Sequence, residues 1–331
     1  MSIGSGMGSS FGFAAETVYG TRIAANRFIK VRSAAINRVN QRQQGEGIIT
    51  GSFGPNVDHF VETTSAATAT VAVDVPYTRM GVLLQTLMGG TSTVVQQAST
   101  AAYLQTHTLG DTTGDMFTAQ VGVPYRDTTV RCHELTGGKI TSAEFSCERG
   151  GLLQANFQID GRAFSDAATL ATVTHNAGVR AFHGGQLLFR CGTFNSEVGI
   201  AVRDVSVSFD RPHDTEGYVS GSAFKTQPVL NGPAEIKGSV TVDWTSAGGK
   251  ALQDFAIANT VNSVVIEWIA DVAIASTHFP TFRITLPSVT WDGDMQGADG
   301  ASELSSKFDF TWRDNSTNAP TITYMSTDLT L

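Results

Sequence analysis

Apolar and polar residues alternate one by one through many short segments of this chain. Alternation with a period of two is typical of strands that bury one face, because successive side chains on a strand point to opposite faces. The pattern predicts strands at residues 70–75, 117–123, 140–147 and 153–159, and again at 202–209, 239–244, 264–269, 283–291 and 304–312. It therefore predicts a mainly β protein with antiparallel sheets.

Two segments depart from this alternation and follow the spacing of a helix. Between residues 80 and 88, large apolar residues recur three and four positions apart, and Gly89-Gly90 follows as a helix stop. At residues 250–258, Ala251, Leu252 and Phe255 fall on one side of a second helix. One short helix is therefore expected in each half of the chain.

The two halves repeat each other in order and in spacing. Each half has two glycines four residues apart, then a strand pattern that ends in aspartate: Gly47, Gly51 and Asp74 in the first half, and Gly217, Gly221 and Asp243 in the second. A period this long indicates duplicated domains, because the units of a solenoid are several times shorter. The sequence predicts two tandem antiparallel β-sandwich or half-barrel domains, at 33–164 and 186–331, each with one short helix.

The remaining residues connect or precede these domains. The small, polar and Gly-containing stretch at 165–185 is the expected linker. Residues 1–32 form an N-terminal arm whose later part, 12–32, carries too many large apolar groups to stay in water. We expect the arm to dock on its own domain or on a neighbouring subunit. The first domain has extra residues, placed within 90–116, that predict a surface loop or an additional hairpin.

Charge and cysteine content narrow the possible functions. The net charge is −8 and the pI is about 5.3, whereas a protein that grips nucleic acid needs clustered Lys and Arg. The three cysteines are far apart and lack the spacing of a zinc site or a disulfide framework. The first residues do not resemble a signal peptide, and no apolar run is long enough to span a membrane.

No catalytic, cofactor-binding or metal-binding residue is predicted. The segment from Asp292 to Glu303 has oxygen ligands at EF-hand-like spacing, but its flanks predict strands, so a solvated hairpin tip is favoured over a calcium site. Cys132, His133 and Glu134 adjoin, yet Cys132 and His133 would point to opposite faces of a strand. P-loop, nucleophile-elbow and zinc-protease motifs are missing from the sequence, so we do not expect an enzyme.

The arm contains the most distinctive short motif of the chain. It has the form E-T-x-Y-G-T with a following R-F, and its residues are Glu16, Thr17, Tyr19, Gly20, Thr21, Arg27 and Phe28. With the later Gly47, Gly51 and Ser52, this motif resembles the start of tail tube proteins (major tail proteins) of long-tailed, non-contractile bacteriophages. The β-rich layout resembles that family over nearly the whole chain, and the internal repeat resembles its two-domain variant.

The resemblance implies a structural protein that polymerises into stacked rings around a channel for DNA ejection. Two domains in one chain imply homotrimeric rings with pseudo-sixfold symmetry. The implied partners are other copies of the chain, the tape measure protein and the tail terminator and distal tail proteins, with double-stranded DNA passing through the lumen without specific binding. The implied location is the virion tail, assembled in the host cytoplasm. We also expect Glu16 or Arg27 to pair across rings.

Other functions are compatible with the composition. A capsid decoration protein or a baseplate component would share the same β-rich chemistry. A β-sandwich adhesin or carbohydrate-binding module would also have Gly-, Ser- and Thr-rich loops. Open-ended polymerisation separates a tube protein from all of these.

Overall fold

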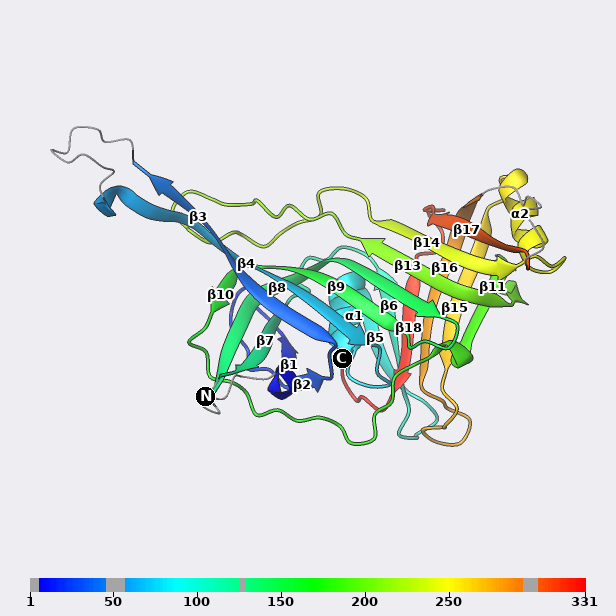
Figure 1. Ribbon diagram of the computed structural model, residues 1–331, viewed down its shortest axis with the longest axis horizontal. Coiled ribbons are helices and arrows are strands. Elements are labelled where there is room, and N and C mark those ends of the chain that lie inside the picture. Colours follow the sequence, from blue (N-terminus) through cyan, green and yellow to red (C-terminus); the bar gives the residue numbers. More distant parts are fainter. Residues whose placement is uncertain (1–5, 46–56, 126–128, 294–302) are drawn as a thin grey trace.

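The computed structural model describes residues 6–45, 57–125, 129–293 and 303–331 of the chain. It is mainly β, with antiparallel strand pairs and two short α-helices, as the alternation predicts. The long strands β3 and β4 project together beyond the rest of the molecule (Figure 1). Gly47, Gly51 and most of the acidic segment after Asp292 lie outside the described residues.

The first half of the chain contains most of the strands that surround α1. In chain order, its elements are η1 (Gly6–Gly8), β1 (Ser10–Ala15), β2 (Arg27–Ile29), β3 (Ser33–Gln44), η2 (Val57–His59), β4 (Phe60–Asp74), α1 (Gly81–Met88), β5 (Gly89–Gln96), β6 (Tyr103–Leu109), β7 (Phe117–Pro124), β8 (Val130–Glu148), β9 (Gln154–Gly161) and β10 (Ala163–Ser165).

The second half has the same succession without the hairpin of β5 and β6. Its elements are η3 (Gly184–Gln186), β11 (Leu187–Thr193), β12 (Ser196–Ile200), β13 (Val202–Asp210), β14 (Glu235–Asp243), α2 (Gly249–Ile257), β15 (Asn262–Ile269), β16 (Thr281–Gly293), β17 (Ser305–Trp312) and β18 (Thr321–Ser326). Strands β3, β4, β9 and β8 pair in that order, as do β13, β14, β17 and β16.

Strand register places equivalent residues of the two halves at equivalent points. Asp74 at the end of β4 is opposite Gln154 on β9, and Asp243 at the end of β14 is opposite Ser305 on β17. Both pairs lie at the corresponding end of a central strand that is followed by the helix. Because the same register recurs, Asp74 and Asp243 occupy equivalent positions in the two halves.

The halves are joined by direct strand pairing. β8 of the first half pairs with β13 of the second over residues 142–148 and 204–210, which makes one sheet in the order β3-β4-β9-β8-β13-β14-β17-β16. One hydrophobic core also includes residues of both halves, with Phe145 packed against Phe209 and Phe282. The two halves therefore share one sheet and one core. The division into domains at 33–164 and 186–331 stays a prediction.

The extra residues of the first half form a hairpin. β5 pairs with β6, and β6 then pairs with β18 of the second half, which buries Gln105 and His107 completely. The hairpin is the second of the two alternatives that the sequence left open for residues 90–116. The β6–β18 pair thus connects the two halves in addition to the β8–β13 pair.

The two helices lie where their apolar spacing predicts. α1 ends at Met88 and is capped by Gly89, which adopts a left-handed φ of 68° that other residues resist. All but Gln85 of α1 is buried, whereas α2 buries Gly249 and Leu252 and exposes Lys250 and Asp254. α1 is therefore enclosed by the rest of the chain, whereas one side of α2 faces solvent.

Candidate functional site

The N-terminal arm packs into the core of its own chain. β1 lies between β2 and β7, and Phe11 and Phe13 are fully buried. Phe28 is also buried, at 3% exposure. Of the two docking sites that the sequence left open, residues 10–29 occupy the one on their own chain.

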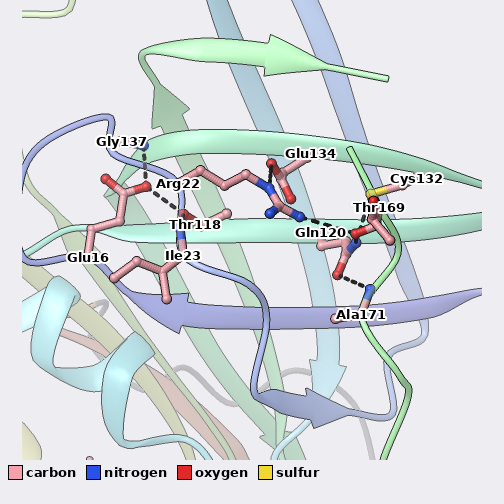
Figure 2. A network of polar contacts seen from close by, with 10 residues as sticks. All are labelled: Glu16, Arg22, Ile23, Thr118, Gln120, Cys132, Glu134, Gly137, Thr169 and Ala171. Carbon is pink, nitrogen blue, oxygen red and sulfur yellow. Dashed lines mark hydrogen bonds and ion pairs between the residues drawn. The ribbon is translucent and has the colours of Figure 1, made fainter. Parts of the chain in front are cut away.

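Glu16 is the centre of the arm's polar contacts (Figure 2). Its Oε1 accepts hydrogen bonds from Thr118 Oγ1 at 2.6 Å and from the Gly137 N–H at 2.9 Å. Its Oε2 accepts the Gly20 N–H at 2.8 Å, and Gly20 has a φ of 73° that closes this loop. The Glu16 side chain is thus buried and bonded within the chain, and pairing of Glu16 or Arg27 across rings stays a prediction.

A second group of contacts ties the arm to the linker. Arg22 Nε donates to buried Glu134 Oε1 at 2.7 Å, and its guanidinium also donates to the Thr169 carbonyl (Figure 2). Gln120 accepts the Ala171 N–H at 3.2 Å and donates to Cys132 Sγ at 2.8 Å. Cys132 and Glu134 thus have structural roles, and His133 lies apart from them, against Phe164.

The other motif residues surround this loop. Tyr19 is half-buried, and its ring lies 5.8 Å from the Arg162 guanidinium. Burial, together with the charge of Asp160, raises the pKa of Tyr19. Thr17 and Thr21 are exposed. Arg27 donates to Thr330 Oγ1 at 2.7 Å near the end of the chain, so its contacts in this structure are also internal.

The eight-strand sheet has one face on the core and an opposite face that is acidic and exposed, except where the segment 211–234 covers it around Asp160. Residues directly opposite on paired strands share a face, which allows this face to be followed across all eight strands. Its carboxylates are Asp74, Glu144, Glu148, Asp204, Asp210, Glu235, Asp243, Asp292 and Asp309. We call this surface the acidic sheet face.

The positive charges on the acidic sheet face are few and paired. Lys237 binds Glu235 at 2.5 Å, and Lys307 lies 3.8 Å from Asp309 on the same strand. The bond to Lys237 lowers the pKa of Glu235. The remaining side chains are mostly Ser, Thr, Asn and Gln. This face therefore repels polyanions and has no cluster of cations that would hold one.

The repeat-equivalent aspartates lie at one rim of the acidic sheet face. Arg32 Nε lies 4.0 Å from Asp74 Oδ1, and Arg203 donates to Asp243. Arg203 also binds Glu303 at 2.9 Å, and these contacts raise its pKa. The same arginine–aspartate pair thus occurs once in each half.

Gly217 and Gly221 lie in the segment 211–234, which connects β13 to β14 and crosses over the first half. Gly221 has a φ of 92°, and Lys225, after this turn, binds Asp160 of β9 at 2.5 Å in a buried ion pair. Burial raises the pKa of Asp160, while its hydrogen bond from Lys225 opposes that shift. The segment therefore fastens one half of the chain to the other.

Sequence reasoning missed a buried cationic cluster at the junction of the halves. Lys139 and Arg211 are almost fully buried and donate to the Thr112 and Gly110 carbonyls. Thr112 also bonds His213 at 2.8 Å. Burial lowers the pKa of Lys139 to about 8 and that of His213 to about 4. In the sequence, Lys139 is a single lysine next to an alternating segment, and nothing in that pattern predicts its burial.

The described parts of the chain do not provide a metal centre or a disulfide. No group of three or more His, Cys, Asp or Glu side chains there could hold an ion, and the three cysteines are free and buried. Glu303 binds Arg203, and residues 294–302 of the candidate calcium loop lie outside the described residues. Neither described helix is long and apolar enough to cross a membrane.

Comparison with known proteins agrees with the arm motif and the layout of the chain. The family model described as phage tail tube protein matches residues 6–326, which is nearly the whole chain. No curated protein matches the sequence. The chain belongs to the phage tail tube protein family.

Proposed function

We propose that three copies of this tail tube protein close into a ring and that the rings stack into the tail tube, with the acidic sheet face lining the channel. The family makes the chain a structural component of the phage tail. The observation that carries the finer proposal is the uninterrupted sheet through both repeats, which gives each chain two similar sectors of a ring. Three chains then supply six sectors.

The polarity of the acidic sheet face supports its place in the channel. DNA phosphates are repelled by carboxylates, and a wall with few unpaired cations offers no site where the duplex would stick. Hydroxyl and amide side chains between the carboxylates keep the wall wetted. The opposite face of the sheet is apolar and covered by the core, so it is unavailable to DNA.

The proposed partners follow from an open tube. Copies of the chain stack on one another, the tape measure protein occupies the lumen before ejection, and the terminator and distal tail proteins bind the ends. Assembly takes place in the host cytoplasm. The protein performs no catalysis, in keeping with a structural family. No observation favours a decoration protein, a baseplate component or an adhesin.

Negative-stain microscopy of the purified protein tests this proposal. Tubes or stacked rings are the expected particles, and end-on views should classify with threefold symmetry and six similar lobes. Small monodisperse particles at every concentration would contradict a tube. Rings with six complete chains would contradict the proposed stoichiometry while leaving the family function in place.

A further inference from the structure

A groove lies between the acidic sheet face and the segment 211–234. This segment runs from β13 back to β4, where Phe224 pairs with Ser65, before it returns to β14 (Figure 1). Strands β3, β4, β8 and β9 form the floor of the groove, and Glu216, Tyr218 and Lys225 form its wall. Its volume is about 300 Å³, and most of its lining side chains carry hydroxyl, amide or carboxylate groups. We call it the polar groove.

Asp160 of β9 lines the polar groove with one oxygen bonded and the other without a donor. Its Oδ1 accepts a hydrogen bond from Lys225 Nζ at 2.5 Å. Its Oδ2 is buried and has no hydrogen-bond partner among the described residues, and Asp160 as a whole is only 7% exposed. A buried carboxylate oxygen without a donor costs free energy, so a donor that reaches Oδ2 would stabilise this site.

The charges of the polar groove do not balance. Asp160 and Glu216 contribute two carboxylates, whereas Lys225 is the single cation among the described residues that line it. Glu216 is exposed, and its carboxylate has no hydrogen bond or ion pair within the described parts of the chain. Burial raises the pKa of Asp160, and the charge of Glu216 raises it further, because the two carboxylates repel each other. One more cation would balance the groove.

An ammonium group suits this position better than a metal ion. The Lys225 ammonium already binds here, to Asp160 Oδ1 and to the Thr215 carbonyl at 3.4 Å. A second ammonium brings three donors, which Asp160 Oδ2, Glu216 and the groove hydroxyls can accept. Calcium takes roughly six to eight oxygen ligands, and the described residues contain no group of three or more His, Cys, Asp or Glu that could hold an ion.

The polar groove continues into a second acidic groove along the same sheet face. Gln158 lines both grooves, and the second one also contains Glu144 and Asp210. Strand register explains this continuity, because Gln158 is opposite Ser142 on β8 and Ser142 is opposite Asp210 on β13. Glu144 and Asp210 are both exposed. A ligand that extends from the polar groove across Gln158 therefore meets a second pair of carboxylates.

We propose that these two adjoining grooves bind a linear aliphatic diamine or polyamine. One ammonium group donates to Asp160 Oδ2 and Glu216, and the second lies beside Glu144 and Asp210. The aliphatic carbons between the two ammonium groups cross Gln158. This inference adds a small cationic ligand to the acidic sheet face, and it does not depend on the number of chains in a ring.

Calorimetric titration of the unassembled protein with putrescine tests the site. Putrescine should bind, and added salt should weaken the binding because its contacts are between charges. Glu216→Gln should weaken binding about two- to fivefold, the range expected for an exposed ion pair. Glu148→Gln is the matched control, since it makes the same change on the same sheet face outside both grooves, and it should leave the affinity unchanged.

A second ligand tests the role of the neighbouring groove. Butylamine has the carbon chain of putrescine but one ammonium group, so it should bind more weakly than putrescine. Asp210→Asn should weaken putrescine binding and leave butylamine binding unchanged. Asp160→Asn is a less suitable variant, because it leaves buried Lys225 without its carboxylate and can prevent folding. The Glu216 and Asp210 variants change exposed side chains and avoid this problem.

Three results would overturn the proposal. The first is a lack of putrescine binding to the wild-type protein, in which case water alone hydrates Asp160 Oδ2. The second is equal weakening by Glu216→Gln and Glu148→Gln, which indicates attraction to the acidic face as a whole. The third is displacement of putrescine by an equal concentration of Mg²⁺, which indicates a metal site. All three leave the proposed rings and tube intact, because microscopy tests those separately.

Discussion

Arg203 donates to Asp243 at the rim of the acidic sheet face, and Arg32 lies 4.0 Å from Asp74 at the same point of the other repeat. These ion pairs are exposed, so they contribute little to stability. They mark equivalent positions, because each joins an arginine near the start of β3 or β13 to the aspartate at the end of the next strand, β4 or β14. The repeat seen in the sequence is thereby a repeat of local geometry.

Truncation of Glu16 should destabilise the chain. Glu16→Ala removes the acceptor for Thr118, Gly20 and Gly137, and we expect a loss of about 3 kcal/mol in the free energy of unfolding. Denaturant titration of unassembled protein measures the loss. Thr17→Ala, at an exposed neighbour, is the control and should change stability by less than about 0.5 kcal/mol. Equal stabilities of the two variants would contradict a structural role for Glu16.

The shared core should make the two repeats unfold together. Phe145 is 1% exposed and contacts aromatic rings of both halves, so Phe145→Ala should cost about 3–5 kcal/mol and shift one common transition. Calorimetry and two spectroscopic probes should report that transition at the same temperature. Two separated transitions, with only one moved by the substitution, would instead indicate independently folding domains.

Stability should decrease in mild acid. Burial lowers the pKa of His107 from 6.5 to about 4, so the unfolded chain takes up a proton in a range where the folded chain does not. The free energy of unfolding should therefore fall as pH drops from about 6.5 to 4. His107→Gln should make this decline shallower, whereas His59→Gln, at an exposed position, should leave it unchanged. An unaltered pH profile in the His107 variant would contradict this assignment.

Reversing charge on the acidic sheet face should make assembled tubes retain DNA. The double variant Glu144→Lys with Asp210→Lys places cations on the proposed wall, and binding of double-stranded DNA should appear and weaken steeply with salt. The matched control reverses Asp166 and Asp254, two exposed carboxylates away from this face. Equal DNA retention by both variants would place the channel elsewhere.

The local sequence pattern was sufficient to predict most helices and strands and the internal repeat. Alternation located the long strands, and the apolar spacing before Gly89 located α1 and its end. The pairing of β8 with β13 was not predictable, because period-two patterns do not specify which distant strand lies alongside. Glu16 or Arg27 was expected to pair across rings, and only the fold shows the donors that surround Glu16 within its own chain.

The symmetry and orientation of chains within the assembled tube test the central claim most directly. A cryo-electron microscopy map of the tube should contain three chains in each ring, with Glu144 and Asp204 facing the lumen. A ring of six chains, or a map in which the acidic sheet face lies on the outer wall, would contradict the account.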